Sequence, residues 1–394
     1  MTSASAPGAL PTAEPIPKIA HFVWLGARLP YSHVLAIRSA ALRGGFDRVI
    51  LLHDTDLSDN PHFTELLGVN RLQVKWLDPF EVLGRVREFG SALIDIYSRL
   101  IEPAARCNLL RLALLLVEGG VYLDLDTITL RSLGPLCERG AFFCGQEHLV
   151  FPEHLRILSN PGGYALALLR AGARDVMRRS PGGWRWFLRF ARLYPRAVNN
   201  AVMGSCPGHP FVRQLLEAAV RLVPRRQMER YALGTSLLQR ELAALTRAYP
   251  SDSAILTKKP IPIFHLGRQD RGTNGLLGQA QSRKKPALKH QARTTNTFTR
   301  SDRAVACSGR DALPIVHVEP PERFYPLGPE VSQHWFRLRR DARDLDELFD
   351  EGTSVVHWYA SVRTRVWTER LEPSCIRRLA DRQWFSRLAS SLLL

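Results

Sequence analysis

The sequence predicts an α/β fold, in which a mostly parallel sheet is flanked by helices and the middle of the chain is mainly helical. Three observations support this prediction. Short apolar runs typical of buried strands recur early in the chain, helical patterns lie between them, and the segment 161–250 carries mainly helical patterns. Strands that alternate with helices indicate a parallel sheet. The 394 residues are enough for one large domain or two smaller ones.

The predicted elements follow in chain order. Strands are expected at 18–26, 48–54, 72–78 and 121–126, where the sequence reads KIAHFVWLG, RVILLHD, LQVKWLD and VYLDLD. Helices are expected at 31–43, 61–68, 80–98 and 104–118, and Gly119 and Gly120 favour a stop after the last of them. Later helices are expected at 163–179, 182–194, 210–223 and 236–249, then a last strand or loop at 354–362 and a terminal helix at 370–394.

Composition divides the chain into parts. Residues 1–15 are small and proline-rich, and they are predicted to be a disordered tail. The block 268–312 is predicted to be a disordered basic insertion or else a sequence error, and between 268 and 310 it holds ten Lys or Arg against two Asp. The flanking runs IPIFHL and LPIVHV could be strands of one sheet. We therefore expect one main domain built from 16–267 and 313–362, followed by a C-terminal helical tail at 363–394.

Charge and cysteine content restrict the class of protein. The net charge of +17 suggests an anionic partner, such as nucleic acid, acidic lipid or a phosphorylated substrate. None of the six cysteines forms a CxxC pair, which argues against structural zinc and a disulfide framework. The sequence shows no signal peptide, and its longest apolar run (109–117) is too short to span a bilayer. We expect a cytoplasmic protein, with peripheral contact at the inner face of a membrane as an option, to which residues 384–394 could contribute.

Two acids at the end of the strand 121–126 are the first candidate site. Asp124 and Asp126 would share one face of that strand, where unpaired carboxylates repel each other unless a cation lies between them. Carboxylate oxygens suit Mg²⁺ or Mn²⁺, and the carboxyl ends of parallel strands are where ligands bind. Asn108 and Arg111 share one face of the preceding helix. The pattern predicts a metal–diphosphate site. The alternative is that the two acids are simply solvated at the end of the strand and bind nothing.

A second acid pair, Asp54 and Asp56, ends the strand 48–54 in the same way. No helix with a comparable polar face precedes it. We therefore favour Asp124 and Asp126 as the site.

Four segments resemble one family. The run NLLRLALLLVEGGVYLDLDT (108–127) resembles the signature of the DXD-containing glycosyltransferases of family thirty-two, which are related to the catalytic domain of the large clostridial glucosylating toxins. IPKIAHFVWLG (16–26), NNAVMGSCPGHPF (199–211) and VHWYAS (356–361) resemble the opening, downstream and closing motifs of that family, in the family's order.

The resemblance implies a GT-A-like (Rossmann-like) fold, a nucleotide-sugar donor, Mn²⁺ or Mg²⁺, and transfer with retention to a glycan, lipid-linked or protein hydroxyl. It implies a catalytic and metal-binding group and a donor-binding group. The first consists of Asp124, Asp126 and Arg111, with Asp126 as a direct metal ligand and Asp124 near the metal. The second consists of Trp24, Asn108, Tyr122, Asn200, His357, Trp358 and Ser361.

The chain departs from the family pattern at Asn108, where an acid is usual, and at Val356 and Val362, where the closing motif usually has His and Trp. Two alternatives to a glycosyltransferase are open: a metal-dependent nucleotidyltransferase, and a basic nucleic-acid-binding protein. The first lacks a good glycine-rich loop near the first strand, and the second lacks a recognisable binding motif. Within the downstream motif, we expect a structural role for His209. Outside the motifs, we expect core positions or an acceptor-stacking role for Trp184 and Trp186.

Overall fold

The computed structural model describes residues 14–151, 158, 160–248, 255–257 and 314–393. The basic block 268–312, most of the N-terminal tail and the strand expected at 261–266 lie outside this part of the chain. The described elements belong to one compact unit.

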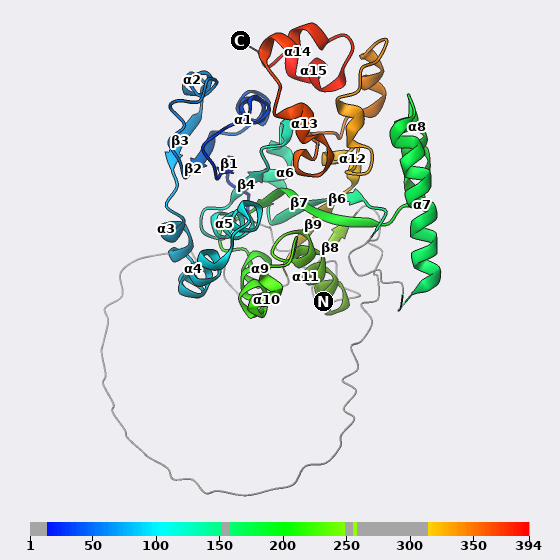
Figure 1. The fold of residues 1–394 in the computed structure, drawn as a ribbon. Coiled ribbons are helices and arrows are strands. Elements are labelled where there is room, and N and C mark those ends of the chain that lie inside the picture. Colours follow the sequence, from blue (N-terminus) through cyan, green and yellow to red (C-terminus); the bar gives the residue numbers. More distant parts are fainter. Residues whose placement is uncertain (1–13, 152–157, 159, 249–254, 258–313, 394) are drawn as a thin grey trace, which may run out of the picture. The chain divides into compact units, whose positions relative to one another are not determined.

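An eight-stranded sheet lies at the centre, with the strand order β3-β2-β1-β4-β7-β6-β9-β8 (Figure 1). Its strands are β1 Ile19–Trp24, β2 Arg48–His53, β3 Leu72–Trp76, β4 Gly120–Leu123, β6 Phe142–His148, β7 Arg196–Ser205, β8 Ile255–Thr257 and β9 Val316–Glu319. Seven strands run in one direction, and β7 runs against its neighbours β4 and β6. A separate antiparallel pair joins β5 (Thr127–Thr129) to β10 (Val355–His357).

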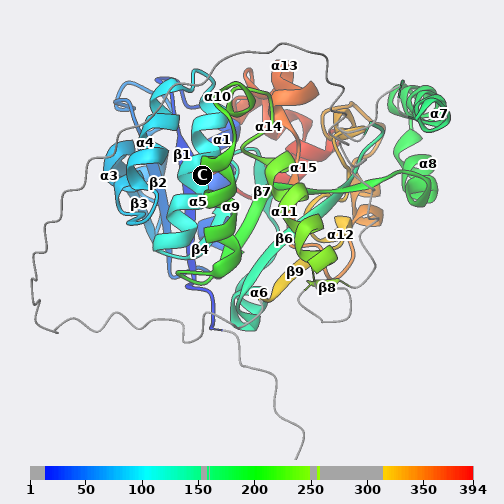
Figure 2. The same cartoon turned by 90° about the horizontal axis from the view of Figure 1, so that it is seen from below.

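Helices cover both faces of the sheet (Figures 1 and 2). One hydrophobic core joins one face to α3 (Pro79–Gly84), α4 (Gly90–Arg99), α5 (Pro103–Val117), α9 (Pro210–Arg221) and α11 (Thr235–Ala248). A second core joins the other face to α1 (Tyr31–Arg43), α2 (Thr64–Leu67), α6 (Gly134–Arg139), α8 (Gly183–Phe190), α12 (Pro321–Phe324), α14 (Pro373–Leu379) and α15 (Trp384–Ser390). The remaining helices are α7 Pro161–Arg179, α10 Pro224–Gln227 and α13 Arg365–Thr368, with short helical turns at Ala191–Leu193, Ser332–Trp335, Arg343–Leu348 and Ala360–Thr364.

The predicted α/β architecture is confirmed, with corrections to its elements. The middle of the chain is mainly helical, as expected, but β7, which the sequence did not predict, crosses the centre of the sheet there. The helix expected at 80–98 is broken into α3 and α4, and the terminal helix is broken into α14 and α15.

The passage from α5 into β4 sets up the site. Gly119 has φ of 66°, and a Cβ atom there would lie 2.7 Å from Pro207 Cδ, so the sharp turn requires glycine. β4 ends at Leu123, three residues earlier than predicted. Asp124 and Asp126 therefore follow the strand rather than lie in it, and their approach depends on the turn that leads into β5.

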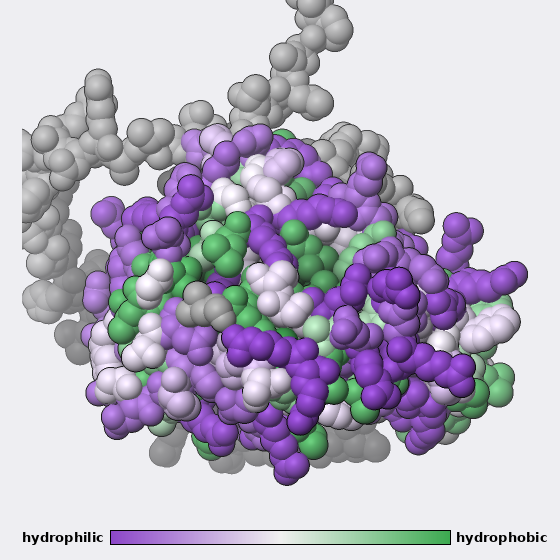
Figure 3. Space-filling view, turned by 90° about the horizontal axis from the view of Figure 1, so that it is seen from above, coloured by the Kyte–Doolittle hydropathy of each residue, from purple (hydrophilic) through white to green (hydrophobic). Residues whose placement is uncertain are grey.

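The C-terminal segment is part of the fold. Trp384 and Phe385 are buried, and the Trp184 ring packs edge-on against Trp384 with ring centroids 4.8 Å apart. The face that carries α14 and α15 is mainly hydrophilic, with small separate hydrophobic groups (Figure 3). The expectation that residues 384–394 could contact a membrane is therefore wrong for these aromatic side chains. Among the described helices, none combines the length and the apolar character needed to cross a bilayer.

Trp184 is a core residue, as expected, but Trp186 is 57% exposed. His209 has the expected structural role, since it is buried and its side chain accepts a hydrogen bond from Phe211 N at the start of α9.

Candidate active site

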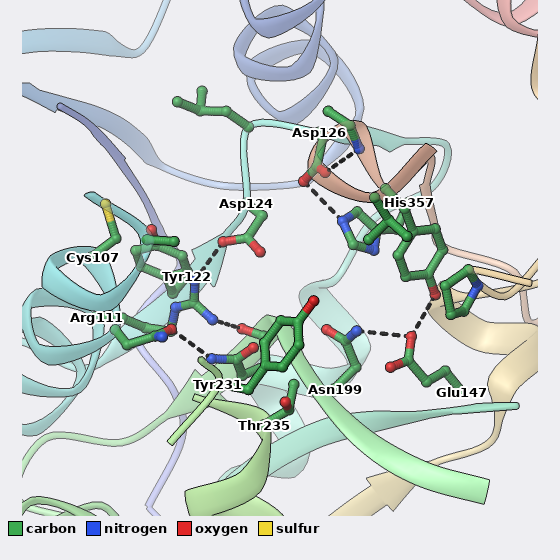
Figure 4. Close-up of a pocket in the computed structure, with 18 of the residues that line it drawn as sticks. Cys107, Arg111, Tyr122, Asp124, Asp126, Glu147, Asn199, Tyr231, Thr235 and His357 are labelled. Carbon is green, nitrogen blue, oxygen red and sulfur yellow. Dashed lines mark hydrogen bonds and ion pairs between the residues drawn. The ribbon is translucent and has the colours of Figure 1, made fainter. Parts of the chain in front are cut away.

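A cavity of about 650 Å³ opens at the carboxyl edge of the parallel strands (Figure 4). It is lined from elements that are far apart in sequence: the end of β1, the first half of α5, the turn after β4, β6, β7 and the segment after β10. This is the edge at which ligands bind in open α/β sheets. Eight of the ten predicted site residues line it: Trp24, Asn108, Arg111, Tyr122, Asp124, Asp126, Asn200 and His357.

One group of side chains in the cavity has metal-ligand geometry. Oxygens of Asp124 and Asp126 and a ring nitrogen of His357 all lie within 4.8 Å of one another. His357 Nε2 lies 2.8 Å from Asp126 Oδ1, and Ala360 N donates to Asp126 Oδ2 at 2.8 Å. β10 brings the histidine there, because His357 pairs with Thr127, the residue after Asp126. The sequence predicted His357 at the donor but gave no sign that it approaches the metal-binding acids.

Electrostatics in this group favour a cation. Burial raises the pKa of Asp124, and although Arg111 opposes this shift, the nearby Asp126 adds to it. Burial also acts to raise the pKa of Asp126, but the charge and hydrogen bond of His357 outweigh it, so that pKa is lowered. Burial acts to lower the pKa of His357, and Asp126 outweighs it, so that pKa is raised. The two carboxylates suit Mn²⁺ or Mg²⁺, which prefer oxygen ligands, and the imidazole is a donor that suits a transition metal rather than Mg²⁺. The DXD motif thus implies a divalent metal, and its identity stays a prediction.

Arg111 is held beside the acids. It is 4% exposed, and it donates to Asp124 Oδ1 at 2.5 Å and to the carbonyl oxygen of Asn200. Its guanidinium lies over the Tyr122 ring, 4.2 Å from the ring centroid. A buried arginine is costly unless paired, and here a carboxylate, a carbonyl and an aromatic face all contact it. Tyr122 therefore supports Arg111, in addition to any contact with a ligand.

Asn108 makes a specific contact although it replaces an acid. Asn200 Nδ2 donates to Asn108 Oδ1 at 2.8 Å. Gly234 lies against the pair, and a Cβ atom there would approach Asn108 Nδ2 to 2.8 Å. The two amides form one side of the cavity, next to Thr235, which also lines it.

Trp24 ends β1 and lines the cavity, with its ring edge-on to His33 at 4.9 Å between centroids. Of the other two predicted residues, Trp358 does not line the cavity. Trp358 is 1% exposed and packs edge-on against Phe385, which is a core role rather than a donor contact. Ser361 lies in the helical turn Ala360–Thr364, and its side chain lies outside the described part of the structure.

Sequence reasoning missed several lining residues, above all Glu147, Asn199, Tyr231 and Tyr359. For Glu147, the sequence offered one signal, an acid that closely follows the apolar residues of FFCGQEH. The structure shows that this segment is strand β6 and that all seven of its residues are buried.

Comparisons with known proteins agree with this geometry. Residues 73–143 match the family described as "Glycosyltransferase sugar-binding region containing DXD motif". No curated protein matches the chain.

Solved structures with some similarity include three toxin domains. The PaToxG glycosyltransferase is 17% identical, with 60% of this chain and 71% of that chain covered and a TM-score of 0.37. The ligand-free glycosyltransferase domain of the YGT toxin is 13% identical, with 52% of this chain and 63% of that chain covered and a TM-score of 0.30. The catalytic domain of Clostridium novyi alpha-toxin is 11% identical, with 60% of this chain and 65% of that chain covered and a TM-score of 0.27.

The family match spans Arg111, Tyr122, Asp124 and Asp126, which all line the one cavity. The expected resemblance to DXD-containing glycosyltransferases is confirmed over residues 73–143. The match supports the expected glycosyltransferase activity, and Asp124-Leu125-Asp126 is the DXD motif of the matched segment.

Proposed function

We propose that the chain transfers a sugar from a nucleotide-sugar donor to a hydroxyl acceptor, with retention at the anomeric carbon and with Mn²⁺ or Mg²⁺. The observation that carries this proposal is the convergence of Asp124, Asp126, His357 and Arg111 on one cavity. A sugar nucleotide combines a diphosphate, which needs cationic partners, with a base, which an aromatic side chain can stack on.

The residues divide the work by chemistry. Asp124, Asp126 and His357 would hold the cation, which when bound offsets the negative charge that develops on the leaving diphosphate. Arg111 donates to the same charge from a buried position, where a fixed donor is most effective. Trp24 is proposed to stack on the base, and Asn108 and Asn200 to bind sugar or ribose hydroxyls.

Two further points are part of the proposal. Residues 16–267 and 313–362 form one catalytic domain, which is supported by the pairing of β9 with β6 and of β10 with β5; residues 363–394 are its tail. The acceptor is a glycan, lipid-linked or protein hydroxyl, and the location is cytoplasmic, with peripheral membrane contact as an option.

The test is a panel of nucleotide sugars incubated with the purified full chain and Mn²⁺. We expect release of a nucleoside diphosphate from at least one donor, and loss of that release when EDTA is added. Release of pyrophosphate or a nucleoside monophosphate would support the nucleotidyltransferase alternative instead. No release from any donor would overturn the proposal.

A further inference from the structure

The wall of the cavity opposite Arg111 carries a carboxyl group that the donor chemistry does not use. Glu147 lies on β6, is 6% exposed and lines the cavity (Figure 4). A buried carboxylate is unfavourable unless it is hydrogen-bonded. Burial raises the pKa of Glu147 to about 7, although hydrogen bonds from Tyr359 and Asn199 oppose the shift.

The hydrogen bonds of Glu147 are all on one oxygen. Tyr359 Oη donates to Oε2 at 2.7 Å, and Asn199 Nδ2 donates to the same atom at 2.8 Å. Asn199 cannot flip its amide, because its Oδ1 accepts from Ala201 N at 2.7 Å. Within the described part of the chain, Oε1 of Glu147 has no hydrogen-bond partner.

Glu330 shows what a purely structural acid on this cavity looks like. It also lines the wall and is buried, but Val150 N donates to its Oε1 at 2.9 Å and Arg174 donates to its Oε2. Both oxygens of Glu330 are used within the protein, whereas Glu147 keeps one acceptor for something that enters the cavity.

Two tyrosines that line the cavity together with Glu147 have strained backbones. Tyr231 has φ of 65° and Tyr359 has φ of 57°, and a bulky residue is uncommon in that region. Such strain tends to persist at ligand sites, where it aims a side chain. Tyr231 is 45% exposed, lines the cavity and reaches into it in Figure 4, whereas the Tyr359 ring lies against His357 at 3.9 Å between centroids.

A cavity that offers both a free hydrogen-bond acceptor and an exposed aromatic ring suits a carbohydrate, which has hydroxyl donors and an apolar C–H face. We propose that Glu147, Asn199 and Tyr359, with Tyr231, form the acceptor site, and that the acceptor is a carbohydrate. Oε1 of Glu147 accepts a hydrogen bond from a hydroxyl of the acceptor that does not react. This inference rests on the proposed function, and it selects a glycan, free or lipid-linked, over a protein hydroxyl.

The bonds and the proton of the transfer step are accounted for without any chemical change at Glu147. The reacting acceptor hydroxyl forms a bond from its oxygen to the anomeric carbon, while the bond from that carbon to the diphosphate oxygen breaks. The electron pair leaves with the diphosphate, which also takes the hydroxyl proton. Glu147 holds the acceptor so that the reacting oxygen is aligned, and misalignment alone can cost about 100-fold in rate.

The test compares transfer with hydrolysis in Glu147→Gln. Asn199 and Tyr359 both donate to one side-chain oxygen of Glu147. In the variant, the glutamine amide oxygen accepts these two hydrogen bonds, and its NH₂ group therefore faces the cavity. The variant thus replaces an acceptor with a donor at almost constant size. We expect transfer to mono- and oligosaccharides to fall about 100-fold, while hydrolysis of the donor and its KM stay within about twofold.

Glu319→Gln is the matched control. Glu319 is buried on the neighbouring strand β9 but does not line the cavity, and it pairs with Arg139 and Arg323. It should leave the ratio of transfer to hydrolysis unchanged. If Glu147→Gln does not fold, Tyr231→Asn serves instead, because asparagine tolerates positive φ; its KM for the sugar acceptor should rise about tenfold.

The outcomes separate the two proposals. A wild-type protein that hydrolyses a donor but transfers to serine or threonine peptides and to no carbohydrate would overturn the acceptor assignment and leave the proposed function intact. An equal loss of hydrolysis and transfer in Glu147→Gln would also overturn it, because Glu147 would then act on the donor. Absence of any donor cleavage would overturn the proposed function, and this inference with it.

Discussion

Two acid pairs with the same spacing follow two parallel strands of the same sheet, yet their surroundings differ. Asp54 and Asp56 come after β2, and Asp124 and Asp126 come after β4, with β1 between these strands. Asp54 Oδ1 accepts from Gly26 N at 2.9 Å, which ties it to the segment after β1, and Asp56 Oδ1 accepts from Ser58 N at 2.9 Å, which closes a local turn. Neither lines the cavity.

The second pair differs in what the rest of the chain brings to it. Arg111 arrives from α5 and binds Asp124, and His357 arrives from β10, 231 positions after Asp126, and binds Asp126. The comparison shows that a DxD motif at a strand end is not enough to form a binding site. Arg111 and His357 complete the site at the second pair, and each prediction below alters an acid of one pair or one of these two partners.

The largest effect is expected from Asp126→Ala. This change removes the acid that contacts both His357 and Ala360 N, and with it a ligand of the cation. Release of nucleoside diphosphate with Mn²⁺ should fall at least about 1000-fold, because the diphosphate charge is no longer offset. Asp56→Ala is the matched control. Unchanged release in the Asp126 variant would refute the metal assignment.

Arg111→Lys should have the next largest effect. Lysine keeps the charge but not the planar fork that reaches Asp124 and the Asn200 carbonyl together. We expect kcat to fall about 100-fold, as for the loss of one donor to a developing charge. The measurement is the steady-state rate of diphosphate release, with thermal unfolding to show that the variant is folded. A kcat within twofold of wild type would show that the fork is not needed.

The sequence predicted those elements whose signal is local. Helix α1 has the predicted bounds, 31–43, and α5 and β1 lie within two residues of theirs. Residues 109–117 of α5 and 19–24 of β1 are mainly apolar runs, which the sequence shows directly. Strand β7 was missed, since Asn199 and Asn200 are poor strand formers and the strand is stabilised by β4 and β6 on either side.

Site contacts, like the secondary-structure elements, could be predicted where they are local in sequence and were missed where they are distant. Asp124 and Arg111 are 13 positions apart, and helix and turn geometry alone bring them near. The approach of His357 to Asp126 depends on the pairing of β10 with β5, and that of Tyr359 to Glu147 spans 212 positions. Such contacts leave no periodic pattern in a single sequence, so the second half of the site became visible only in the fold.

Mn²⁺ affinity should depend on pH through His357. Its pKa is raised by Asp126, so the ring holds a proton to higher pH than usual, and that proton must leave before the nitrogen can bind a cation. The apparent affinity should therefore rise with pH and fall about tenfold per unit below the pKa of His357. The lowered pKa of Asp126 adds no dependence in this range, whereas the raised pKa of Asp124 adds to the loss of affinity at low pH. The measurement is Mn²⁺ titration by calorimetry at several pH values. His357→Gln should flatten the dependence, and an equally steep dependence in that variant would exclude the histidine as a ligand.

The smallest effects are expected at the first acid pair. Asp54→Ala removes the acceptor of Gly26 N and should lower the free energy of unfolding by about 1 kcal/mol, because a partly buried N–H loses its partner. Asp56→Ala removes only an exposed turn contact and should leave stability unchanged. Both variants should release diphosphate within about twofold of wild type, since neither acid lines the cavity. Denaturant unfolding and the same release assay check both statements. A large loss of activity in either variant, without a loss of stability, would mean that the two acid pairs act together, and the contrast drawn between them would be wrong.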